Sequence, residues 1–266
     1  MIESPQGFVV FEECRKAAFQ NGFRRVLGPS EGWAHFASTT AKGTLMLAAG
    51  GPKGPWYLAL DHSGVISEIN LQPTDLPGPG LARYSFESLG ELYEVLSRVY
   101  ALALALPDGP LETFLAKTKN LPKTTEAERL VIQRVGQDVF RERLLAYWGG
   151  HCPLTGITDT ALLRASHIIP WSDCESDAER LHIHNGLLLS ALWDAAFDRG
   201  LVTFDPDGNP VFASSLSQAA RAELRWHGPI SLKEGHRQRL VWHREHLFNK
   251  FTEGDQPSVD VVGGRV

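Results

Sequence analysis

Two stretches decide the fold of the second half of the chain: Arg164-Ala-Ser-His-Ile-Ile-Pro-Trp171 and His184-Asn-Gly-Leu-Leu-Leu-Ser-Ala-Leu-Trp-Asp-Ala-Ala-Phe-Asp-Arg-Gly200. The apolar run 187–189 is too short for a helix and predicts a buried strand after the Asn-Gly turn. Ser190 can cap a following helix, and Gly200 stands where a helix-ending glycine belongs. The pattern therefore predicts a strand that ends at His167, a turn, a second strand and a short helix.

The short helix carries two carboxylates, Asp194 and Asp198. Residues four apart project from one helical face about one turn apart, so these two side chains are neighbours. A base and a bound cation can together activate a water molecule for hydrolysis. Carboxylate oxygens suit a hard cation such as Mg²⁺, which keeps most of its waters. Beside an apolar hairpin that carries a histidine, this pair indicates a metal site more than a solvated acidic face.

This strand–turn–strand–helix unit resembles the HNH nuclease motif, the ββα-metal fold. The resemblance covers residues 126–250, and its specific residues lie within 164–200. It implies that His167 is the general base and that Asn185 braces the loop that carries this base. It also implies that Asp194 and Asp198 bind Mg²⁺, Mn²⁺ or another divalent cation, which makes the motif an H-N-D variant.

Two positions depart from the pattern of the family. Many members place Asp or His immediately before the base, where this sequence has Ser166, a weak neutral metal ligand. Many members also hold a structural zinc ion with two Cys-x-x-Cys pairs. Here Cys152 has lost the second cysteine of its pair and Cys174 is the only other cysteine nearby, so we expect no structural zinc.

The net charge of −5 disfavours binding to DNA, which is itself negatively charged. Binding would therefore need a local arginine surface, since a bulk positive field is absent. Arginine can grip a phosphate with two hydrogen bonds, and Arg134 and Arg141 lie seven residues apart on one face of a predicted helix that Thr125 caps. Arg164 and Trp171, which flank the first strand of the motif, complete the expected DNA-binding set. A solvated helical face with ion pairs stays open as the alternative for the helix.

The first half predicts a separate α+β unit. Its apolar patterns and turn signals indicate helices over 8–21 and 86–106 and strands over 33–36, 44–49, 56–60 and 65–70. Trp33, Trp56 and Tyr57 either belong to its core or form a stacking pocket for an unpaired base, and the sequence alone does not choose between these.

We therefore expect an α+β protein of two domains, an N-terminal recognition or interaction domain (1–120) and an HNH nuclease domain with flanking helices (121–266), with a linker at 118–125 across their boundary. The chain shows no secretory signal and no membrane span, which favours a cytoplasmic protein. The expected function is metal-dependent hydrolysis of DNA, of a restriction or defence type that senses sequence or modified bases. Two alternatives stay open: a non-catalytic HNH fold that binds DNA, or an effector nuclease whose first domain binds a protein partner. A homodimer is also open.

Overall fold

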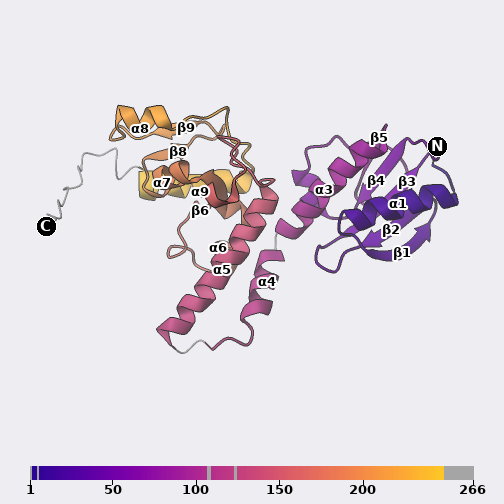
Figure 1. Ribbon diagram of the computed structural model, residues 1–266, viewed down its shortest axis with the longest axis horizontal. Coiled ribbons are helices and arrows are strands. Elements are labelled where there is room, and N and C mark those ends of the chain that lie inside the picture. The colour runs from indigo at the N-terminus through magenta and orange to yellow at the C-terminus, as the bar shows by residue number, and fades with distance from the viewer. Residues whose placement is uncertain (1, 5, 107–108, 123–124, 249–266) are drawn as a thin grey trace, which may run out of the picture. The chain divides into compact units, whose positions relative to one another are not determined.

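The computed structural model describes residues 2–4, 6–106, 109–122 and 125–248. The chain divides into two compact units, Met1–Gly149 and Gly150–Val266. Both combine helices with small antiparallel sheets, so the fold class is α+β as the sequence predicts (Figure 1). No helix within the described ranges is long and apolar enough to cross a membrane.

The first unit is built on one five-stranded antiparallel sheet whose strand order follows the chain. Its strands are β1 (Arg25–Ser30), β2 (Trp33–Ala37), β3 (Thr44–Ala49), β4 (Trp56–Leu60) and β5 (Ala82–Phe86). Helices α1 (Phe8–Gln20) and α3 (Leu89–Ala105) pack on this sheet and on each other (Figure 1). All residues of β4 are buried, because both faces of the central strands are covered.

Residues that alternate along β2, β3 and β4 form a core cluster of Trp33, Met46, Ala48, Tyr57 and Ala59. Ile2 and Leu76, from segments far apart in sequence, pack against this cluster.

Helix α5 (Glu126–Tyr147) belongs to the first unit, together with α4 (Gly109–Thr118), and packs on α3 and α4. The Tyr147 hydroxyl donates a 2.9 Å hydrogen bond to the buried Glu68 carboxylate, and the Arg98 guanidinium donates to the Tyr147 carbonyl at 2.7 Å. Gly149 and Gly150, which both adopt positive φ, follow the helix at the division. The division therefore lies at 149–150 and not near residue 120, where the sequence pattern suggests a linker.

Two local expectations for the first unit differ from the structure. Residues 65–70, expected as a strand, lie largely in helix α2 (Ser63–Glu68). The His62 side chain caps this helix by accepting a hydrogen bond from the Val65 amide, and Val65 and Ile69 are buried one turn apart. The long helix begins at Leu89 because Ser88 caps it, and β5 occupies the residues just before.

The second unit contains the predicted hairpin and helix. Strand β6 (Leu163–His167) pairs antiparallel with β7 (Gly186–Ser190), and α7 (Ala191–Asp198) follows directly. The remaining elements are α6 (Asp177–Arg180), β8 (Val202–Phe204), β9 (Pro210–Phe212), α8 (Gln218–Glu223) and α9 (Glu234–His243). Helix α9 ends at His243, and the chain continues as one π-turn over Arg244–Phe248.

Aromatic side chains pack against the face of α7 that points away from β6. The Phe197 ring stacks on His243 at a centroid distance of 4.0 Å, and Trp193 stacks on Phe204 at 6.3 Å. The His243 ring also bonds the Phe197 carbonyl and the Thr203 hydroxyl. This packing holds α7 against β8 and α9, so that the opposite side of the helix faces β6.

Candidate functional site

His167 is the last residue of β6, opposite Gly186 of β7. Its Nε2 lies 3.0 Å from the backbone carbonyl oxygen of Arg180. A carbonyl oxygen can only accept a hydrogen bond, so Nε2 carries the proton of the neutral ring and Nδ1 carries the lone pair. Burial lowers the pKa of His167 to about 4, which keeps the ring neutral at physiological pH. The residue therefore has the protonation state that a general base needs.

Asn185 is fully buried and holds together the loop that connects β6 to β7. Its side-chain oxygen accepts from the Ile169 amide at 2.9 Å, and its amide nitrogen donates to the Ile169 carbonyl at 3.1 Å. Longer contacts of 3.4 Å reach the Cys174 sulfur and the Glu179 carbonyl. This side chain thus ties the start of the loop to its end, which is the arrangement that the resemblance implies for this position.

Arg180 completes the same loop and was not singled out from the sequence. Its guanidinium donates to the Trp171 carbonyl at 3.0 Å and to the Cys174 carbonyl at 2.6 Å, and it pairs with Asp177 at 3.1 Å. The Trp171 ring lies edge-on to His167 and below the guanidinium of Arg180, at centroid distances of 5.7 Å in both cases. Arg180 therefore uses its side chain to shape the loop and its carbonyl to orient His167. An isolated arginine in a charged segment carries no sequence signal for such a role.

The acidic side chains lie on the face of α7 next to β6. Ser166, on β6 and only 2 % exposed, donates a 2.5 Å hydrogen bond from its hydroxyl to Asp194. Partial burial raises the pKa of Asp194, although the Ser166 hydrogen bond and the charge of Arg164 oppose that shift. The pKa of Asp198 is raised to about 6, first by desolvation and then by the negative charge of Asp194. The Asp198 side chain is partly exposed to solvent, and screening by water weakens this rise in its pKa.

This environment fits a hard divalent cation. Two neighbouring carboxylates repel each other, and a cation between them would relieve that repulsion. Mg²⁺ needs only one or two protein carboxylates because waters fill its other positions. Within the described ranges no group of three or more His, Cys, Asp and Glu side chains could hold a metal ion. Asp194 and Asp198 would supply the protein ligands, with the Ser166 hydroxyl orienting Asp194.

The four residues expected to bind DNA fall in different units. Arg164 is exposed on β6 and donates to the carbonyls of Ala161 and Leu163, so it lies beside the motif with Trp171. Arg134 and Arg141 lie on α5, within the first unit. The structure thus groups Arg164 and Trp171 with His167, whereas the arginines of the helix belong to the other compact body.

The aromatic residues considered as a base pocket lie in the core of the first unit. Trp33 is 1 % exposed, Trp56 is 3 % exposed and Tyr57 is 6 % exposed. Trp33 and Tyr57 fill the cluster that Ile2 and Leu76 cover, so neither ring offers a face on which a base could stack. Their density in the sequence is therefore explained by packing.

The cysteines of the second unit also have structural surroundings. Cys152 and Cys174 are buried free thiols, and Cys174 donates to the Ile169 carbonyl. Burial raises the pKa of Cys174 to about 11, which keeps it a neutral thiol. Hydrogen bonds of Asn185 and Arg180 and the apolar packing of α7 hold the motif in this structure.

Comparison with known families agrees with this geometry. Residues 152–205 match the family model described as HNH endonuclease, and this range contains β6, β7 and α7 with His167, Asn185, Asp194 and Asp198. No curated protein matches the chain significantly. A domain of this family implies DNA as the substrate and a divalent metal ion as the cofactor. The C-terminal half of the chain therefore contains an HNH endonuclease domain.

Proposed function

We propose that the protein is a metal-dependent endonuclease that hydrolyses DNA phosphodiester bonds at the site formed by His167, Asn185, Asp194 and Asp198. The observation that carries this proposal is the hydrogen bond from His167 Nε2 to the Arg180 carbonyl. It supports the proposal because it assigns the lone pair of the neutral ring to Nδ1, which is the protonation state that a general base needs.

His167 would accept a proton from the attacking water. The water oxygen forms a bond to phosphorus while the bond from phosphorus to the 3′ oxygen breaks. The 3′ oxygen takes up a proton from solvent, which leaves a 5′-phosphate and a 3′-hydroxyl. Asn185 and Arg180 hold the loop, and hence the histidine, in one orientation during this transfer. A cation bound at Asp194 and Asp198 would stabilise negative charge on the phosphate and on the leaving oxygen.

We further propose that the activity is of a restriction or defence type and that the first unit senses the substrate. Its support is the division of the chain, because the first unit has its own sheet and core and contains none of the candidate catalytic residues. Phosphate contacts near the active site give affinity without sequence information, so discrimination would need another surface. The effector alternative, in which the first unit binds a protein, predicts cleavage without such discrimination.

The test is cleavage of plasmid DNA by the full chain with Mg²⁺, Mn²⁺ or EDTA, on unmodified, methylated and hydroxymethylated substrates. His167→Ala should reduce cleavage by roughly 10²–10⁴-fold while DNA binding persists, because only proton abstraction is lost. His227→Ala is the matched control, since this exposed histidine of the same unit lies outside the motif. Equal activity of the two variants would refute the assignment of the base. Inactivity of the wild-type protein with every cation and substrate would favour the non-catalytic alternative.

A further inference from the structure

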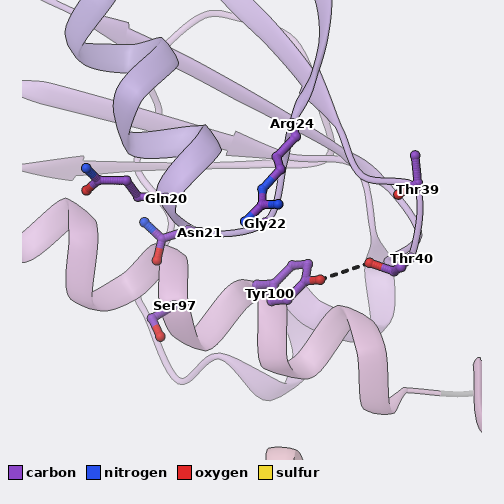
Figure 2. A pocket seen from close by; sticks show the side chains of 8 residues that line it. All are labelled: Gln20, Asn21, Gly22, Arg24, Thr39, Thr40, Ser97 and Tyr100. Carbon is purple, nitrogen blue, oxygen red and sulfur yellow. Dashed lines mark hydrogen bonds between the residues drawn. The ribbon is translucent and has the colours of Figure 1, made fainter.

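A polar pocket in the first unit lies away from the HNH motif in the chain. It has a volume of about 370 Å³, within the range of small-ligand sites, and lies between the end of α1, the turn after β2 and helix α3. Its lining consists of Gln20, Asn21, Gly22, Arg24, Thr39, Thr40, Ser97 and Tyr100 (Figure 2). No carboxylate and no aliphatic side chain belongs to this set, which we call the α1–α3 pocket.

The charge and the hydrogen-bond donors of the α1–α3 pocket suit an anion. Arg24 supplies a guanidinium with five N–H donors, and four of the other side chains supply hydroxyls. Figure 2 shows the Arg24 side chain running toward Gly22 and the ring of Tyr100. In the part of the chain that the structure describes, the side chains of Arg24, Thr39 and Ser97 form no hydrogen bond or ion pair with protein groups. These donors are therefore available to a ligand.

Two fixed residues shape the wall of the pocket. The Tyr100 hydroxyl lies 2.9 Å from the Thr40 hydroxyl (Figure 2). The Tyr100 ring also packs edge-on against Phe23 at 5.7 Å. Gly22 has a φ of +86°, and a Cβ at this position would collide with the Tyr100 ring. The close approach of the chain to this ring thus depends on glycine and leaves the Arg24 side chain beside the opening.

The end of helix α1 opposes anion binding only weakly. A helix C-terminus carries partial negative charge on its unsatisfied carbonyls. Here the Asn21 side chain donates to the Ala17 carbonyl, and the amides of Asn21 and Gly22 donate to the carbonyls of Ala18 and Phe19. Because these carbonyls already accept hydrogen bonds, the positive charge of Arg24 determines the sign of the electrostatic potential in the pocket. The nearest carboxylate along α3, Glu94, lies one turn before Ser97 and outside the lining.

We infer that the α1–α3 pocket binds a phosphate ester of a nucleotide. A guanidinium can grip two phosphate oxygens at once, and hydroxyls can donate to the others. The guanidinium and hydroxyl groups of the lining thus match the oxygens of a phosphate and its sugar. Such an ester could be a phosphate of the DNA backbone or that of a free nucleotide. The DNA case rests on the proposed function, since it assigns the pocket to the substrate of the HNH domain.

The test compares Arg24→Gln with Arg25→Gln in the full chain, in EDTA to prevent cleavage. Both substitutions remove one positive charge from exposed neighbouring residues, but only Arg24 lines the pocket. One arm measures binding of a 20-base-pair duplex as a function of salt, and the other measures binding of 2′-deoxyadenosine 5′-monophosphate by calorimetry. Ser97→Asp serves as a second variant, because it places a carboxylate in the lining from an exposed helical position.

If the ligand is the DNA backbone, Arg24→Gln should weaken duplex binding on the order of tenfold and make the salt slope shallower by about 0.9, with a smaller effect of Arg25→Gln. If the ligand is a free nucleotide, Arg24→Gln and Ser97→Asp should abolish mononucleotide binding and leave duplex binding unchanged. Equal effects of the two arginine variants in both arms, or no effect of Arg24→Gln in either, would overturn the inference. Binding that depends on Arg24 in a protein without nuclease activity would refute the proposed function and leave the pocket standing.

Discussion

Replacement of Asn185 by alanine should loosen the loop between β6 and β7 that surrounds His167. The side chain makes two hydrogen bonds of good length, at 2.9 and 3.1 Å, to the amide and carbonyl of Ile169. Each such bond contributes about 1 kcal/mol net, and the buried Ile169 amide left without a partner adds a penalty of about 1–3 kcal/mol. The free energy of unfolding of the second unit should therefore fall by about 3–5 kcal/mol.

The same substitution should also disturb the orientation of His167 through the backbone of the loop. Asn185 contacts the Glu179 carbonyl, next to the Arg180 carbonyl that bonds His167. When the loop is released, the ring loses the partner that fixes its tautomer, so cleavage should fall more than DNA binding.

The assay combines urea unfolding with hydrogen–deuterium exchange and plasmid cleavage. In Asn185→Ala the Ile169 amide should exchange much faster than in the wild-type protein, because its partner is gone. Asn209→Ala is the matched control: this side chain bonds Asp205 in a surface turn, and its loss should cost about 1 kcal/mol or less. An unchanged unfolding midpoint together with unchanged exchange at Ile169 would refute the bracing role of Asn185.

Four further predictions concern the same unit. Asp194→Ala should abolish cleavage and weaken Mg²⁺ or Mn²⁺ binding measured by calorimetry, whereas Ser166→Ala should only reduce cation affinity; equal affinities in wild type and Asp194→Ala would contradict the metal site. Because the pKa of Asp198 is raised to about 6, cation affinity should fall as pH drops through about 6, and Asp198→Asn should remove this dependence. Arg180→Lys keeps the charge but loses the planar contacts to the loop carbonyls, so its kcat should fall nearly as far as that of Arg180→Ala, with little change in KM; full activity of the lysine variant would show that charge alone suffices. The pKa of His243 is lowered to about 4 by burial, so the unfolded state takes up its proton first and stability should fall as pH drops from about 6.5 toward 4; His243→Gln should flatten that part of the pH profile measured by thermal unfolding.

The expectation for residues 65–70 shows where sequence patterns mislead. Val65 and Ile69 favour a strand by propensity, but the same two residues are four apart and both are buried on one side of α2. The side chain of His62 caps this helix, and such a cap carries no strong signal in the sequence, because serine, threonine, asparagine and aspartate are the usual capping residues. Tertiary packing therefore overrides a weak local preference.

The edge strand β1 shows a second limit. Its residues are mostly exposed, it contains Gly28 and Pro29, and its pairing with β2 is irregular between Val26 and Gly28. A strand of this composition lacks the alternating apolar pattern on which prediction depends. Only the pairing with β2 makes it part of the sheet.

The sequence by itself determined the HNH motif. His167, the Asn-Gly turn, the apolar run and the helix with Asp194 and Asp198 are close in the chain, so their spacing encodes strand, turn, strand and helix through local rules. The order of these residues was therefore sufficient to predict the elements and the family, both of which are confirmed.

The tertiary structure alone decided three other features: that α5 belongs to the first unit, that Arg180 orients His167 through its carbonyl, and that Trp33 and Tyr57 are core residues. Each depends on which groups meet after folding. Helix α5 is held by contacts such as that from Tyr147 to Glu68, which are 79 residues apart. A backbone carbonyl is present in every residue, so nothing in the sequence marks the one that accepts the proton of a histidine. Local spacing specifies elements, whereas long-range contacts and burial specify how those elements are used.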